Sequence, residues 1–99
     1  MAVMEIKVFP LGTQSTSVSA FVAAAVRAVK ESGLSYRLTP MGTVVEGSVD
    51  ALLALAARVH ETPFEAGAER VVTTIEIDDR RDKPISMDGK VRSVEEKLA

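Results

Sequence analysis

The stretch that decides the fold is residues 36–47, YRLTPMGTVVEG, in which two short β-like runs flank the turn residues Pro40, Met41 and Gly42. Runs of this kind on either side of a proline and a glycine predict a β-hairpin, in which we expect Gly42 to adopt a positive φ. The second run ends in Glu46. A carboxylate at the end of an apolar strand is costly unless it is solvated or paired, so Glu46 is the first candidate for a ligand contact.

Outward from this hairpin, the chain alternates between strand and helix patterns. Period-two alternation of apolar and polar residues predicts strands, and apolar residues at helical spacing predict helices. The predicted elements are, in chain order, a strand over residues 4–8, a helix over about 18–32, strands over 34–40 and 43–46, a helix over about 49–60, a strand over 69–79 and a short tail helix over about 86–99.

Proline, glycine and serine mark the expected boundaries of these elements. Pro10 should end the first strand, and Pro63 should end the second helix, because proline lacks the backbone N–H that a strand or helix needs. Gly33 is placed to follow the first helix, and Ser48 is placed to cap the second.

The order β-α-β-β-α-β with a tail helix predicts an α+β fold, the ferredoxin-like split-βαβ sandwich, as one domain over residues 1–99. Both long helices would cover one face of a four-stranded sheet. The bare face would carry Glu5, Lys7, Arg37, Thr39, Val72, Thr74, Glu76 and Asp78. A small domain gains from burying such a face, so we expect a homo-oligomer, with the Val91, Val94 and Leu98 stripe also covered.

Composition excludes several classes of function. Twelve Lys and Arg against fourteen Asp and Glu give a net charge of −2, which offers no general attraction to nucleic acid or to anionic membranes. The chain has no cysteine and one histidine, His60, so neither a disulfide nor a transition-metal site is expected. No leader or membrane-spanning pattern is visible, so we expect no membrane partner and a cytoplasmic location.

Three polar groups each allow a functional and a structural interpretation. Glu46 can bind a ligand amine, or it can be solvated or pair with Arg37 or Lys7. The hydroxyl-rich loop over residues 13–17 can hold a polar ligand, although capping the next helix is the commoner role. His60 near a helix end is more often structural than catalytic.

The acidic end of the last strand could bind a divalent cation, but local pairing with Arg80 and Arg81 is the better interpretation because the spacing fits no calcium loop. The acidic residues are Glu76, Asp78, Asp79 and Asp82.

Four segments, residues 10–13, 32–36, 40–47 and 71–81, together resemble the small, single-domain thiamine-binding proteins of the YkoF-like superfamily. The PMGT-x-x-EG pattern over residues 40–47 is the most specific, and the resemblance runs from Met4 to Val94. It implies a ferredoxin-like fold, a homodimer or homotetramer built through sheets, and binding of thiamine or its hydroxymethylpyrimidine moiety. It implies no known catalytic activity, cofactor or metal.

On this resemblance, Glu46 would accept charge-assisted hydrogen bonds from an aminopyrimidine, and the cationic thiazolium would suit an acidic protein. The other expected ligand contacts are the hydroxyls of Thr43, Thr13, Ser15 and Ser17 and the apolar side chains of Met41, Tyr36 and Phe9. The alternative is a structural or regulatory homo-oligomer without a small-molecule ligand. An enzyme would need a positioned nucleophile or acid–base pair, and the sequence offers none with convincing spacing.

Overall fold

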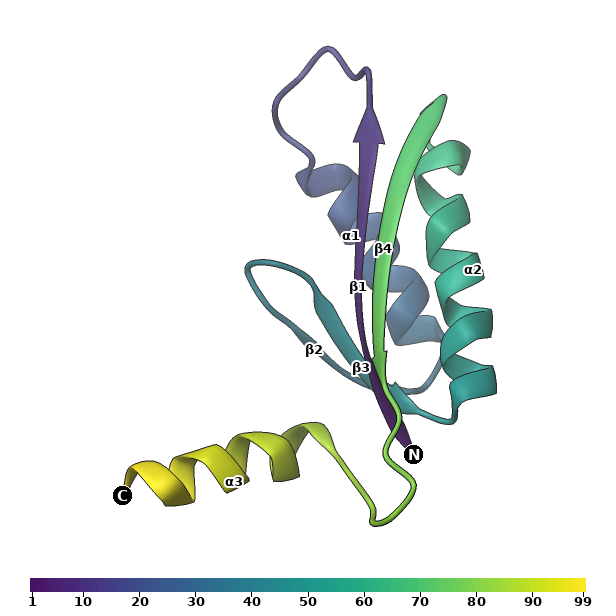
Figure 1. Cartoon of the computed structure of the whole chain (residues 1–99). Coiled ribbons are helices and arrows are strands. Elements are labelled where there is room, and N and C mark those ends of the chain that lie inside the picture. The colour runs from purple at the N-terminus through teal and green to yellow at the C-terminus, as the bar shows by residue number, and fades with distance from the viewer.

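The computed structural model describes all 99 residues and has the predicted order of elements (Figure 1). The four strands form one sheet in the order β2-β3-β1-β4, and every neighbouring pair is antiparallel. This is the predicted ferredoxin-like α+β fold. The elements are β1 (Ala2–Leu11), α1 (Ser19–Glu31), β2 (Ser35–Leu38), β3 (Thr43–Gly47), α2 (Val49–Glu65), β4 (Arg70–Asp78) and α3 (Met87–Leu98).

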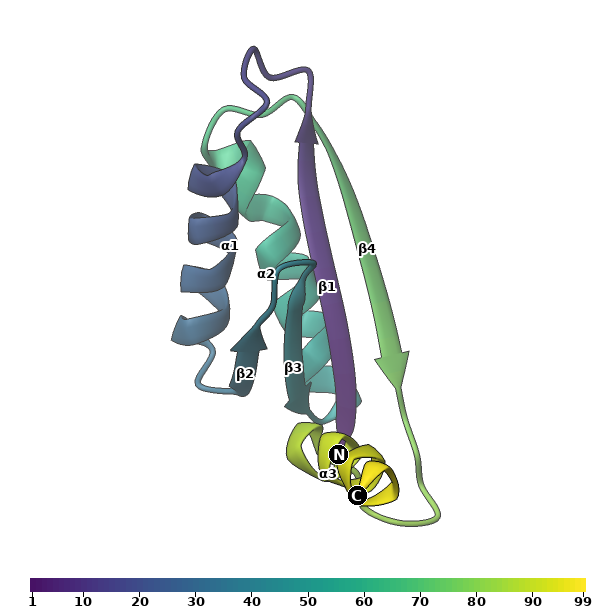
Figure 2. The same cartoon turned by 90° about the vertical axis from the view of Figure 1, so that its left-hand side faces the viewer.

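Helices α1 and α2 lie side by side against one face of the sheet (Figures 1 and 2). The alternation along β1 aims Met4, Ile6 and Val8 at these helices, and all three side chains are buried. In the register, Met4 lies opposite Val45 and Ile77. Burying each such side chain contributes roughly 1.5–3 kcal/mol, so this face holds the core. The core also contains Ala2, Ala25, Ala28, Val29, Leu52, Leu55, Ala56 and Val59.

The other face of the sheet, which we call the open face, is covered by neither α1 nor α2. Glu5 lies opposite Val44 on one side and Glu76 on the other, and Phe9 lies opposite Val72. The register therefore confirms the predicted bare face. Only the first turn of α3 lies against it, at the end where β3 finishes, and the rest of α3 extends away from the body (Figure 1).

Pro10 does not end the first strand, as the sequence predicted, but lies inside β1 opposite Val71. The register explains the difference, because β3 pairs with β1 only from Ala2 to Ile6. Beyond Ile6, β1 has β4 as its sole neighbour, and a proline is tolerated where a strand has a free edge.

Pro63 does not end the second helix either, because α2 continues through it to Glu65. In an unbroken helix the N–H of residue 63 would donate to the carbonyl of Val59, and proline has no N–H. The Thr62 hydroxyl donates to that carbonyl instead, at 2.8 Å, and both Thr62 and Val59 are buried. The threonine thus replaces the hydrogen bond that the proline removes.

Two smaller expectations also change. No side chain caps α1, because the hydroxyls of the preceding loop bond within the loop, whereas Ser48 caps α2 as predicted by accepting from the N–H of Ala51. Gly42 does not have a positive φ. Its lack of a side chain instead lets the hairpin turn lie close to β1, since a Cβ at position 42 would lie 3.1 Å from Cγ of Lys7.

The Thr62–Pro63 arrangement makes a testable prediction. Thr62→Val leaves the buried Val59 carbonyl without a donor and should lower the free energy of unfolding by about 1–3 kcal/mol. Pro63→Ala restores a backbone N–H, so Thr62→Val should cost much less in that background. Urea denaturation of the two single variants and the double variant measures this coupling. Strictly additive losses would show that the hydroxyl does not replace the missing N–H.

Candidate functional site

Glu46 lies on the open face and contacts the start of α3. Its Oε2 accepts the backbone N–H of Met87 at 2.8 Å, while Ser86 caps the same helix by accepting from Gly89 at 3.0 Å. A carboxylate at a helix N-terminus is favourable, because it satisfies a free N–H and complements the helix dipole. Met87 is buried by this contact. Glu46 is therefore paired with the backbone N–H of Met87. Its partner is neither Arg37 nor Lys7, the two that the sequence suggested.

Two ion pairs fasten the same end of α3 to the outer strands of the sheet. Arg37 of β2 pairs with Asp88, and Asp78 of β4 pairs with Lys90. All four side chains are substantially exposed, so each pair contributes little to stability. The first turn of α3 is thus held over the open face by these polar contacts together with the buried side chain of Met87.

A cleft of about 620 Å³ lies on the open face next to this turn. We call it the acidic cleft, and its lining residues are Val3, Glu5, Val44, Glu76, Ile77, Asp78 and Lys90. Glu5 and Glu76 lie directly opposite each other on neighbouring strands. Glu5 also forms an ion pair with Lys7, with 3.4 Å between Oε1 and Nζ. Like charges in this position are unfavourable, so a bound cation would be stabilised here.

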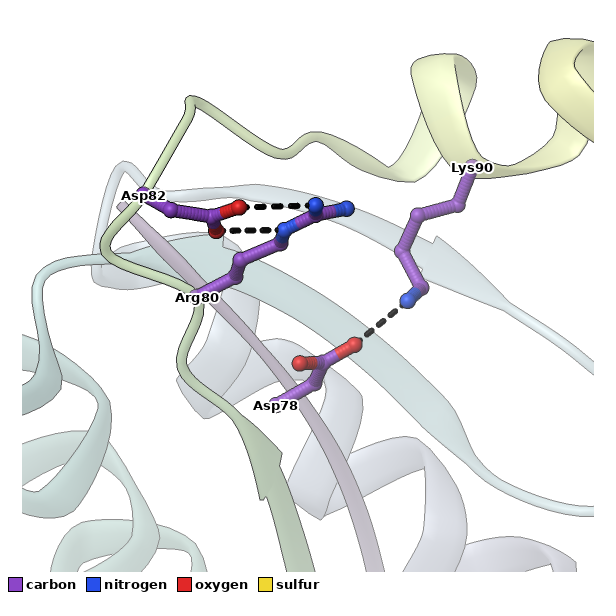
Figure 3. Close-up of polar contacts among 4 residues, drawn as sticks. All are labelled: Asp78, Arg80, Asp82 and Lys90. Atoms are coloured by element: carbon purple, nitrogen blue, oxygen red, sulfur yellow. Dashed lines mark hydrogen bonds and ion pairs between the residues drawn. The ribbon is translucent and has the colours of Figure 1, made fainter.

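The charged segment after β4 pairs locally, as the sequence favoured. Arg80 donates from Nε and Nη2 to the two carboxylate oxygens of Asp82, at 2.6 and 2.8 Å (Figure 3). The hydrogen bond from Arg80 lowers the pKa of Asp82, and that from Arg81 lowers the pKa of Asp79. No group of three or more His, Cys, Asp or Glu side chains is arranged to hold a metal ion.

The hairpin residues expected at the site lie on the other face of the sheet from Glu46. Thr43 and Tyr36 have the same orientation as the core residue Val45, because they lie two residues along β3 and directly opposite it on β2. Thr43 is 7% exposed and Tyr36 is 37% exposed. Met41 lies at the tip of the hairpin and is 73% exposed. These three side chains do not converge on Glu46 within one chain.

The hydroxyl loop lies at the far end of β1. Val3 is opposite Glu46, and β1 continues for eight residues to Leu11, which at about 3.3 Å per residue is roughly 26 Å away; residues 13–17 lie beyond that end. Thr13 donates to the carbonyl of Ser15, and the Ser15 hydroxyl accepts from the N–H of Ser17. Phe9 lies on the open face, about 20 Å from Glu46 by the same measure. One chain therefore does not gather the eight expected residues into a single site.

His60 has a structural contact. Its Nδ1 lies 2.7 Å from Oγ1 of Thr73, and its ring meets Phe64 edge-on with the centroids 5.5 Å apart. The histidine thus joins α2 to β4, which agrees with the structural interpretation of the sequence.

Sequence reasoning missed most of the acidic cleft. Glu5 and Glu76 were placed on the bare face, but their direct opposition follows only from the register between β1 and β4. The parity of their positions on neighbouring strands was the available signal. Lys90 had no such signal, because its contact with Asp78 depends on the path of the linker before α3.

Comparisons with known proteins give the family. The profile of a family described as thiamine-binding protein matches residues 4–95. A UPF0045 protein of Methanothermobacter thermautotrophicus is 46% identical over 99% of this chain and 100% of its own length. The structure of a hypothetical protein of Methanocaldococcus jannaschii is similar, with a TM-score of 0.89, 34% identity and 96% of each chain covered.

A Thermotoga maritima protein, whose name assigns it provisionally to thiamine biosynthesis or salvage, has a TM-score of 0.78 at 22% identity. It covers 94% of this chain and 97% of its own, and at this identity the likeness concerns the fold alone. No helix of the structure has the length and apolar character needed to span a membrane. The family match and the 46% identical relative confirm the resemblance seen in the sequence, and the chain belongs to the thiamine-binding protein family.

Proposed function

We propose that the protein binds thiamine, or a ligand that shares its hydroxymethylpyrimidine moiety, and acts as a non-catalytic carrier, buffer or sensor. The family description supports this class of ligand. The observation that carries the proposal is the acidic cleft, an open hollow of about 620 Å³ lined by Glu5, Glu76 and Asp78.

The chemistry of the acidic cleft suits a cationic heterocycle. Carboxylates attract the positive thiazolium, and the apolar side chains of Val3 and Val44 offer contact to a ring. The absence of catalysis and the cytoplasmic location stay predictions.

Glu46 borders the acidic cleft, because its neighbour across the sheet is Val3 and the residue two positions before it is Val44. Only Oε2 takes part in the hydrogen bond with Met87, which leaves Oε1 to accept from an aminopyrimidine. We propose this second contact in place of the wider set of hydroxyl and aromatic contacts, which one chain keeps apart.

We also propose that copies of the chain associate as a homodimer or homotetramer. The apolar side chains Val91, Val94 and Leu98 of α3 are 46%, 59% and 80% exposed, and Phe9 and Val72 on the open face are 44% and 46% exposed. Exposed apolar patches such as these two can mark interaction sites. Association of the chains would bury these side chains. The alternative function, a structural or regulatory homo-oligomer without a ligand, would also require this association.

The Glu5–Glu76 opposition predicts opposite effects on stability and binding. Glu76→Gln removes the repulsion and should raise the free energy of unfolding by about 0.2–1 kcal/mol. The same change removes attraction for a cation and should weaken thiamine binding about three- to tenfold. Calorimetric titration and urea denaturation measure the two effects, with Glu96→Gln on exposed α3 as the matched control. An unchanged affinity in Glu76→Gln would place the ligand elsewhere.

Two substitutions of Glu46 distinguish a structural role of this residue from a role in ligand binding. Glu46→Gln retains an acceptor for the Met87 N–H but loses the charge, so stability should change little while thiamine affinity falls about ten- to hundredfold. Glu46→Ala removes the acceptor as well and should lower the free energy of unfolding by about 1–2 kcal/mol. Titration calorimetry decides the matter, since a Gln variant with wild-type affinity would leave Glu46 with only the task of holding α3.

The exposed stripe of α3 makes the assembly testable. Light scattering at micromolar concentration should give two or four times the monomer mass. Val94→Asp places a charge in the stripe and should shift the mass toward that of one chain, because burying an unpaired charge is costly. Ser93→Asp adds the same charge one position away and serves as the control. A wild-type protein that scatters only as a monomer would refute the association.

A further inference from the structure

A second cleft, of about 740 Å³, lies between α3 and the segment over residues 79–86. We call it the linker cleft. Its lining residues are Asp78, Arg80, Lys83, Pro84, Ile85, Ser86, Gly89, Lys90, Val91, Ser93, Val94 and Glu95. None of the residues expected to contact ligand from the sequence lies here, and the proposed function does not use this space.

Three cations, from Arg80, Lys83 and Lys90, line the linker cleft against two carboxylates, from Asp78 and Glu95. Arg80 donates to Asp82 through Nε and Nη2, which leaves Nη1 without that partner, and Lys83 takes part in no ion pair. Figure 3 shows the Arg80 guanidinium and the Lys90 ammonium, each with its carboxylate partner, Asp82 and Asp78. Because Arg80 and Lys90 are each paired with a carboxylate, Lys83 is the cation of the linker cleft that has no such partner.

The linker cleft and the acidic cleft are adjacent, because Asp78 and Lys90 line both. The ion pair between these two residues marks the boundary (Figure 3). A ligand that crosses this boundary would meet carboxylates at one end and cations at the other. Carboxylates in the acidic cleft and cations in the linker cleft thus suit a molecule with a cationic ring and an anionic group.

We propose that the linker cleft binds a phosphate group, so that the preferred ligand is a phosphate ester of the cationic heterocycle held in the acidic cleft. This inference rests on the proposed function for the heterocycle and adds a subsite for its phosphate. Lys83 and the free edge of Arg80 supply donors to the phosphate oxygens, and the Ser93 hydroxyl lies on the same wall.

The Lys90–Asp78 ion pair couples the two clefts, because breaking it changes the charge that each cleft presents to a ligand. Exposed ion pairs are weak, and a phosphate monoester carries a charge of about −1.5 to −2 at neutral pH. Lys90 can therefore exchange Asp78 for the phosphate at small cost. The Asp78 carboxylate is then free to face the cationic ring, so that binding at one end favours binding at the other.

The test compares thiamine with thiamine monophosphate by titration calorimetry at low salt. The wild type should bind the monophosphate at least about tenfold more tightly, because only the ester reaches the linker cleft. Lys83→Met should remove most of this preference and leave thiamine affinity unchanged. Lys97→Met, at the other end of α3 and outside both clefts, is the matched control and should keep the wild-type preference.

The outcomes distinguish the two proposals. Equal affinities for thiamine and its monophosphate in the wild type would overturn the phosphate subsite and leave the proposed function intact. If neither molecule binds, the proposed function fails. Pyrophosphate, which has no cationic ring, tests the subsite alone. It should bind the wild type several-fold more tightly than Lys83→Met, and equal binding to the two proteins would overturn the subsite whatever thiamine does.

Discussion

Two helices cannot cover both faces of a four-stranded sheet, and this constraint organises the whole molecule. Helices α1 and α2 bury the face that carries Met4 and Ile6, so the opposite face keeps its charged and apolar side chains exposed. The candidate site, the apolar surface proposed for association and the position of α3 all follow from that uncovered face. The acidic cleft lies where the face is partly shielded by one turn of α3 and still open to a small molecule.

Helix α3 is attached in a way that leaves it easy to move. A hydrogen bond from Met87 to Glu46, the buried side chain of Met87 and two exposed ion pairs hold its first turn, while Val91, Val94 and Leu98 further along stay largely exposed. Segments with few buried apolar contacts open at low free-energy cost. A ligand that replaces these contacts, or a second chain that covers the stripe, can therefore reposition α3 without disturbing the core.

The sequence predicted the parts of the fold that depend on local pattern. Strand alternation identified the two faces, and Ser48 and Gly33 marked helix boundaries correctly. The wrong boundaries had tertiary causes, since Pro10 is allowed by a free strand edge and Pro63 by the Thr62 hydroxyl. The site was harder, because the Glu46–Met87 contact joins residues 41 positions apart and the Glu5–Glu76 pair depends on strand register.

The central proposal is that the ligand binds in the acidic cleft. The most direct measurement is a titration of the isotope-labelled protein with thiamine, followed by backbone amide chemical shifts. The account predicts that the largest changes occur at Val3, Glu5, Val44 and Glu76, with smaller changes at the start of α3 as its contacts rearrange. Changes confined to the loop over residues 13–17, or to α1 and α2, would contradict it.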